Sequence, residues 1–142
     1  MKVLIAFDGS PSACHALKRA VELFGAGEPE IIMLGVVSLP TTSSPGAEAA
    51  HAELCDEFHA EMREAAEEVR RSELSVELIL AEGEPRRVLE KYAEEKEPDV
   101  VVVGARGQSA LAKVLLGSVS TYAVKHLSVP VLLVRLPAGE DL

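Results

Sequence analysis

The sequence predicts a doubly wound α/β domain, in which a five-stranded, mainly parallel sheet is covered by helices on both faces. Five short apolar segments alternate with longer amphipathic ones, which is the pattern of alternating strands and helices. The apolar segments are nearly continuous, as in strands buried on both faces, and the segments between them are long enough for right-handed crossovers. The 142 residues fit one domain, which we assign to 1–142.

The expected strands are short runs of aliphatic residues bounded by glycine, proline or acidic residues. They cover 3–7, 31–37, 75–81, 100–103 and 129–134. The third run differs from the others because Val76, Leu78 and Leu80 alternate with Ser75 and Glu77. This alternation is typical of a strand near the edge of a sheet, where one face is less completely covered.

The helices are predicted from their capping signals and composition. Ser10 is suited to cap a first helix that starts at Pro11, carries an apolar face through Leu23 and Phe24, and ends at Gly25 and Gly27. Residues 47–71 are rich in Ala, Glu and Arg and predict one long helix, after a loop at 41–46. A third helix follows Gly83-Glu84-Pro85 and runs to about residue 96.

A glycine pattern follows the fourth expected strand and is the main indication of function. It runs Gly104-x2-Gly107-x9-Gly117-Ser118, and a last helix is expected to begin near Ser118, with Val119, Ala123, Val124 and Leu127 facing inward. Glycine lets the main chain approach a ligand closely, and a helix start presents free N–H groups and the positive end of its dipole. Backbone of this kind binds anions, most simply a phosphate group.

The distribution of charge supports an anion site at this place. The net charge of −9 argues against broad binding to nucleic acid or anionic membrane. However, no Asp or Glu occurs from Val100 to Gly139, whereas four basic residues do: Arg106, Lys113, Lys125 and Arg135. Since surface charges are screened beyond about 8 Å at physiological salt, this acid-free segment is what a bound anion would sense.

Cysteine usage and hydropathy indicate the cellular compartment in which the protein is expected. Cys14 and Cys55 form neither a disulfide framework nor a CxxC pair, so a reducing cytoplasm is the expected location. The apolar run at the start of the chain stops at Asp8 and is too short for the core of a signal peptide. No apolar run approaches the roughly 20 residues that cross a bilayer, and we expect no membrane association.

The glycine pattern, together with Phe7-Asp8-Gly9-Ser10 after the first strand, resembles the universal stress protein family over nearly the whole chain. The resemblance implies the strand order 3-2-1-4-5 and membership of the ATP-binding branch. It implies that Asp8 holds the ribose side, that the backbone of Val36 reads the adenine edge and that Gly104 passes close to the ribose. The whole implied nucleotide site is Ala6, Asp8, Val36, Val103, Gly104, Gly107, Gly117, Ser118, Val119 and Ser120.

In the implied site, Gly107, Gly117 and Ser118 surround the phosphates through their N–H groups, and the hydroxyls of Ser118 and Ser120 add contacts. Simpler interpretations stay open: the glycines make turns, Ser118 caps a helix, and Asp8 caps the turn after the first strand. Arg106 and Lys113 are within reach of the outer phosphates in sequence terms, but exposed basic residues are more often only solvated.

Three functions follow as hypotheses. The first is an ATP-binding regulator of stress or signalling that uses nucleotide occupancy as a signal, with Mg²⁺ held by the phosphates and water. The second is a slow ATP-hydrolysing or phosphate-transferring enzyme, which lacks support because no GxxxxGK[ST] loop or evident base is present. The third is an interaction module with an empty pocket, acting through protein partners that the sequence does not identify.

Two further features concern assembly and metals. The last strand is apolar enough to associate at an open edge, and the family resemblance also implies a homodimer through this strand. His51, Cys55 and His59 repeat at four-residue spacing on the long helix. Two of them are able to share an ion, but His51 and His59 are about 12 Å apart along the axis. Because no matching ligand pair stands out elsewhere, we expect packing or a partner contact rather than a metal site.

Overall fold

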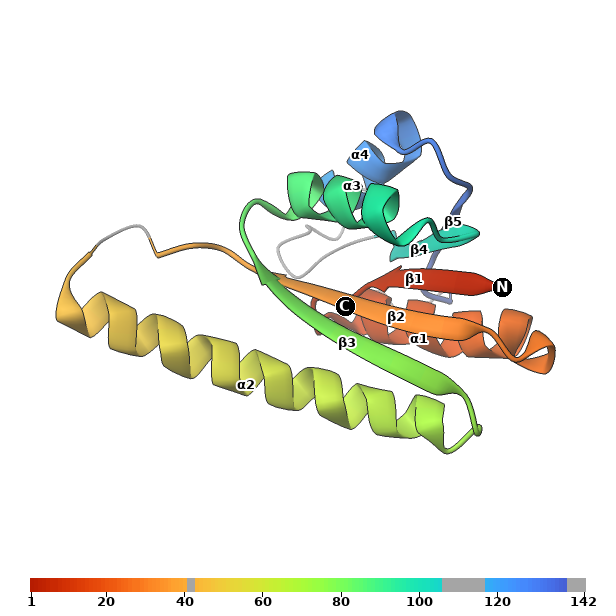
Figure 1. Cartoon of the computed structure of the whole chain (residues 1–142), viewed down its shortest axis with the longest axis horizontal. Helices are drawn as coiled ribbons and strands as arrows, with labels where there is room; N and C mark the ends of the chain where they lie inside the picture. The colour runs from red at the N-terminus through yellow and green to blue at the C-terminus, as the bar shows by residue number, and fades with distance from the viewer. Residues whose placement is uncertain (41–42, 106–116, 138–142) are drawn as a thin grey trace.

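The computed structural model describes residues 1–40, 43–105 and 117–137 and contains one parallel sheet of five strands in the order β3-β2-β1-β4-β5 (Figure 1). The elements are β1 (Lys2–Ala6), α1 (Pro11–Phe24), the 3₁₀ turn η1 (Gly25–Gly27), β2 (Glu30–Val37), α2 (Pro45–Arg70), β3 (Ser75–Glu82), α3 (Pro85–Lys96), β4 (Val100–Gly104), α4 (Ser118–His126) and β5 (Val131–Val134). The predicted fold class and strand order are confirmed.

The central strand β1 fixes the register of its two neighbours. Ile5 lies opposite Met33 of β2 and opposite Val102 of β4, and all the strand pairs are parallel. β3 and β5 therefore form the two edges of the sheet. The alternating sequence of β3 had predicted an edge position, and this is confirmed.

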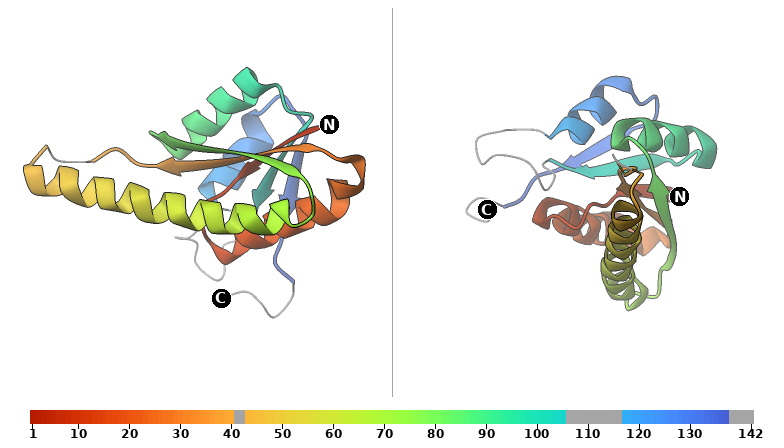
Figure 2. Two further views of the ribbon diagram at one scale, coloured as in Figure 1. Left: turned by 60° about the horizontal axis from the view of Figure 1, so that its bottom comes forward. Right: turned by 90° about the vertical axis from the view of Figure 1, so that its left-hand side faces the viewer.

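Helices cover both faces of the sheet, and side chains alternate between the two cores. α1 and α2 lie on one face, whereas α3 and α4 lie on the other (Figures 1 and 2). Val3 and Ile5 point into the core under α1 and α2, and Leu4 between them points into the core under α3 and α4. Val3, Leu4 and Ile5 are fully buried, so both faces of the middle of β1 are covered, which explains its run of apolar residues.

The helix starts follow the capping signals closely. The Ser10 hydroxyl accepts a hydrogen bond from the Ala13 N–H at 3.1 Å, as predicted for the cap of α1. The prediction for α2 was wrong at its start, because Ser44 caps the helix and Pro45 occupies its first turn. Proline has no N–H to lose at that position and its φ suits a helix, so a Pro-Gly pair that suggested a loop begins the helix instead.

Three other details differ from the sequence-based expectations. β5 begins at Val131 rather than at residue 129, since Pro130 supplies only a carbonyl, which accepts the Val101 N–H at 2.9 Å. Leu23 and Val124 are exposed rather than inward-facing. Both lie on helix faces turned from the sheet, where an isolated apolar residue is tolerated.

None of the helices in the described part of the chain combines the length and the apolar character that crossing a bilayer requires.

Candidate functional site

The carboxyl ends of β1 and β4 lie side by side, and the predicted site is built from the segments that follow them. β1 leads through a tight turn into α1, β4 ends at Gly104, and α4 begins at Ser118. In a doubly wound sheet the crevice at this edge, where the strand order reverses, is the usual place for a ligand.

The turn after β1 is shaped by Asp8. Its Oδ1 accepts a hydrogen bond from the Ser10 N–H at 2.9 Å, and Gly9 between them has a φ of 79°. This φ lies in the left-handed region, which glycine adopts without steric cost. Asp8 therefore does cap the turn, as the simpler interpretation held, and its half-buried carboxylate sits at the edge where the ligand role was predicted.

Gly104 is required by packing between β4 and the first turn of α1. A Cβ at this position would lie 2.6 Å from the Ser12 Oγ and 2.8 Å from both the carbonyl carbon and the oxygen of Ser12. Real Cβ atoms do not approach backbone so closely. The absence of a side chain at Gly104 thus lets the end of β4 lie directly against α1.

The start of α4 is tied to the end of β4 through the carbonyl of Ala105. The Gly117 N–H donates to the Ala105 oxygen at 2.6 Å. The Ser120 hydroxyl, which is 3 % exposed, lies 3.0 Å from that same oxygen and 3.0 Å from the Gly117 oxygen. The amide of Gly117 and the hydroxyl of Ser120, both predicted to contact phosphate, are engaged within the protein in this structure.

The first turn of α4 retains the donors that an anion needs. Thr121 makes the first intrahelical bond, to the Gly117 oxygen at 3.0 Å, so the N–H groups of Ser118, Val119 and Ser120 precede the helical ladder. No side chain among the described residues caps this helix, and Ser118 is exposed. These three amides carry the positive end of the helix dipole.

The remaining predicted site residues divide into two groups. Ala6, Val36, Val103 and Val119 all contribute to the core under α3 and α4, and Val103 is 2 % exposed. Gly107 lies outside the described residues, as do Arg106 and Lys113. The structure therefore brings the ends of β1, β4 and the start of α4 together, and it leaves the intervening loop undescribed.

Sequence reasoning missed two residues that hold this arrangement. Ser12 receives Gly104 against its backbone, and Ala105 accepts from both Gly117 and Ser120. Ser12 is 4 % exposed and Ala105 is 5 % exposed. Neither carried a signal in the sequence, because their contribution is made mainly by backbone atoms.

Cys14 of α1 has acidic side chains near it that affect the pKa of its thiol. Burial, followed by the charges of Asp8, Glu61 and Glu68, raises the pKa of the Cys14 thiol. The thiol is thus kept protonated, which is unfavourable for a nucleophile.

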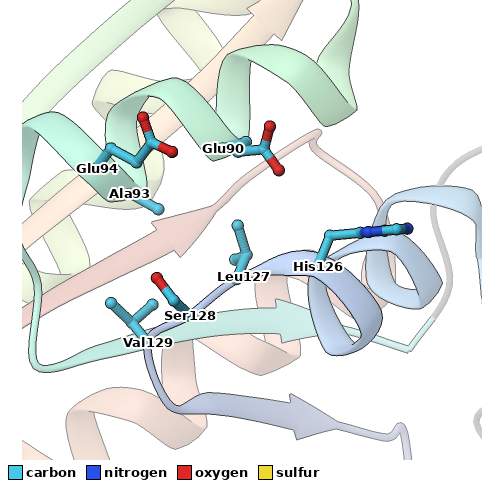
Figure 3. Close-up of a pocket in the computed structure, with 7 residues that line it drawn as sticks. All are labelled: Glu90, Ala93, Glu94, His126, Leu127, Ser128 and Val129. Carbon is cyan, nitrogen blue, oxygen red and sulfur yellow. The ribbon is translucent and has the colours of Figure 1, made fainter.

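A separate hollow lies between α3 and the carboxyl end of α4 (Figure 3). It is lined by Glu90, Ala93, Glu94, His126, Leu127, Ser128 and Val129. His126 is the last residue of α4, so the hollow is at the opposite end of that helix from Ser118. It contains none of the predicted site residues.

The fold and the site together define a doubly wound α/β domain with the first-turn amides of a helix at the carboxyl edge of its sheet. The model of the universal stress protein family matches residues 1–135, and the chain belongs to that family. Universal stress protein YxiE of Bacillus subtilis is 34% identical over 145 residues, which cover 94% of this chain and 98% of that protein.

Solved structures agree with this assignment. The universal stress protein UspA from Lactobacillus plantarum superposes with a TM-score of 0.82 at 26% identity, covering 95% of this chain and 97% of its own. A universal stress protein solved in complex with cAMP has a TM-score of 0.70 at 27% identity, with 95% and 96% of the two chains covered.

Proposed function

We propose that this protein binds ATP at the carboxyl edge of its sheet and that nucleotide occupancy acts as a signal in a cytoplasmic stress or signalling response. The observation that carries the proposal is the first turn of α4, where three amides precede the helical ladder beside the ends of β1 and β4. Support comes also from the family membership and from the structural relative solved with cAMP.

In this proposal, fewer of the described groups donate hydrogen bonds to the phosphates than the sequence suggested. Ser118, Val119 and Ser120 supply N–H groups to the phosphates, and the exposed Ser118 hydroxyl adds a contact. Gly117 contributes by leaving room for the ligand, since its own amide is paired with Ala105. Gly107 is retained as a predicted phosphate contact.

The sugar and base are assigned to the neighbouring strand ends. Asp8 would accept hydrogen bonds from ribose hydroxyls through its carboxylate, which already accepts the Ser10 N–H. Gly104 lies beside the Asp8 turn because α1 packs against it, and the backbone of the half-buried Val36 would read the adenine edge. The residues present therefore fit a nucleotide.

A Mg²⁺ ion is proposed to accompany the triphosphate. The segment from Val100 to Gly139 carries no acidic side chain, so the ion would be held by phosphate oxygens and water. When bound, it would neutralise part of the phosphate charge beside an otherwise acidic protein.

We also propose a homodimer through β5. This strand is an edge of the sheet, and Val131, Leu132 and Leu133 are only half-buried in the single chain. Pairing with the same strand of a second copy would cover these side chains and satisfy the open edge.

The nucleotide proposal is tested by calorimetric titration of ATP into the wild type and a Gly117→Val variant. A side chain at Gly117 should obstruct the phosphates and remove one or two charge-assisted hydrogen bonds, which weakens binding by about 10–100-fold. Gly27→Val is the matched control, because a Cβ there meets nothing within 4 Å. Gly27 also precedes the amino end of β2, whereas the proposed site is at the carboxyl ends of the strands. Wild-type protein without ATP affinity, or equal affinities for all three proteins, would contradict the proposal.

A further inference from the structure

Three potential metal ligands meet where α2 passes the carboxyl end of β3. His51 and Cys55 lie one turn apart on α2, and Glu82 is the last residue of β3. The His51 Nε2 is 3.3 Å from the Glu82 Oε1 and 3.6 Å from the Cys55 Sγ, and one ligand atom from each residue lies within 4.8 Å of the others. The sequence had shown the pair on the helix but not the carboxylate that the sheet brings to it.

Hydrogen bonding alone accounts poorly for this cluster. Both short distances involve the same atom, the Nε2 of His51. That nitrogen has either one proton or one lone pair, directed along a single line in the ring plane. It is therefore unable to donate well to Glu82 and accept well from Cys55 at the same time, whereas a cation between the three groups would attract all of them.

The spacing agrees with tetrahedral zinc coordination. Zinc bonds of about 2.3 Å to sulfur and about 2.0–2.1 Å to nitrogen and oxygen place the nitrogen about 3.6 Å from the sulfur and about 3.4 Å from the oxygen. The observed 3.6 Å and 3.3 Å match these edges. The sulfur-to-carboxylate edge requires a movement of at most about 1.2 Å, which Glu82 allows because its side chain is 51% exposed.

We propose that His51 Nε2, Cys55 Sγ and a carboxylate oxygen of Glu82 bind one Zn²⁺ ion, with water as the fourth ligand. The mixed nitrogen, sulfur and oxygen set suits this borderline-soft ion better than Mg²⁺ or Ca²⁺, which prefer oxygen. The thiol releases its proton to solvent as sulfur coordinates. None of the three ligands belongs to the predicted nucleotide site, so this proposal does not depend on nucleotide binding.

Zinc at this position would tie the first half of α2 to the sheet. The amino-terminal turns of α2 reach beyond the carboxyl end of β3 (Figure 1), and most residues from 45 to 57 are exposed. These turns have little packing of their own, so the cluster is placed where a cross-link adds most order. Metal occupancy would therefore be seen in the protection of this part of the helix.

The test is a titration of the metal-free, reduced protein with Co²⁺, a spectroscopic substitute, followed by displacement with Zn²⁺. We expect one Co²⁺ per chain with the charge-transfer absorption of a thiolate ligand. Cys55→Ser should abolish that absorption, and His51→Gln or Glu82→Gln should weaken binding at least tenfold, since even outer-shell partners cost about 10–100-fold. Cys14→Ser and His59→Gln are controls that keep the ligands and should bind as the wild type does.

Circular dichroism establishes that each variant retains its fold before binding is compared. No binding to the wild type, or an unchanged spectrum in Cys55→Ser, would overturn the site. Wild-type affinity in Glu82→Gln would overturn the three-ligand assignment. Slower hydrogen exchange of amides in 45–57 on zinc addition, absent from Cys55→Ser, would support the proposed cross-link, and unchanged exchange in a zinc-loaded wild type would overturn it.

Discussion

Replacing Gly104 with Ala should destabilise the protein more than a single methyl group normally does. The new Cβ would lie 2.6 Å from the Ser12 Oγ and 2.8 Å from two backbone atoms of Ser12. Overpacking of a core typically costs about 1–3 kcal/mol. Because two of the three contacts are with backbone, a change of rotamer gives little relief, and we place the cost in the upper part of that range, at about 2–3 kcal/mol.

Equilibrium unfolding in urea measures this cost. With a slope of about 2 kcal/mol per molar urea, the midpoint of Gly104→Ala should fall by about 1–1.5 M. Gly27→Ala is the control, because no atom lies within 4 Å of a Cβ there. Adding Ser12→Gly to Gly104→Ala removes the hydroxyl but keeps the backbone, so most of the loss should persist. Full recovery in that double variant, or a midpoint as high as that of the control, would refute the backbone-contact argument.

Other substitutions test the helix contacts. Gly35→Ala places a Cβ 2.6 Å from the Sδ of Met62, a flexible side chain, so urea unfolding should show a smaller loss of about 1 kcal/mol. Ser10→Ala removes the cap of α1 and should cost about 1 kcal/mol in the same assay; no loss would contradict the capping role. A hydrogen bond from Arg86 lowers the pKa of Glu84 in the folded protein. The ionised Glu84 therefore stabilises the fold above its ordinary pKa of about 4.3, and this stabilisation disappears as the pH falls through the lower pKa of the folded state. Glu84→Gln should therefore reduce the loss of thermal stability below about pH 4.5, and an unchanged acid profile would show that the bond contributes nothing.

Most of the fold was predictable because each local signal agreed with the global arrangement. The uninterrupted apolar runs of β1 and β4 predicted strands buried on both faces, and Ser10-Pro11 and Gly83-Glu84-Pro85 predicted helix starts. The strand order came from family resemblance, since periodicity specifies strands but not their neighbours. The boundaries that failed, at Pro45 and Pro130, are prolines, whose effect depends on whether an N–H is needed at that position.

Asp8 and Gly104 could be located from their residue types at the ends of β1 and β4, and their roles toward a nucleotide stay predictions. The candidate site was not predictable where backbone atoms decide, as in the pairing of the Gly117 amide with Ala105. The cluster of His51, Cys55 and Glu82 shows the same limit, because helical spacing reveals only ligands on one element. The sheet supplies the third ligand from 27 residues beyond Cys55 in the sequence.

The central claim is that the first-turn amides of α4 hold the phosphates of ATP. It is tested most directly by amide NMR spectra of ¹⁵N-labelled protein, titrated in parallel with ATP and with adenosine. The N–H signals of Ser118, Val119 and Ser120 should move with ATP and stay in place with adenosine, and the Gly117 signal, already paired with Ala105, should move less. Saturation with ATP that leaves those three signals unmoved would contradict the account.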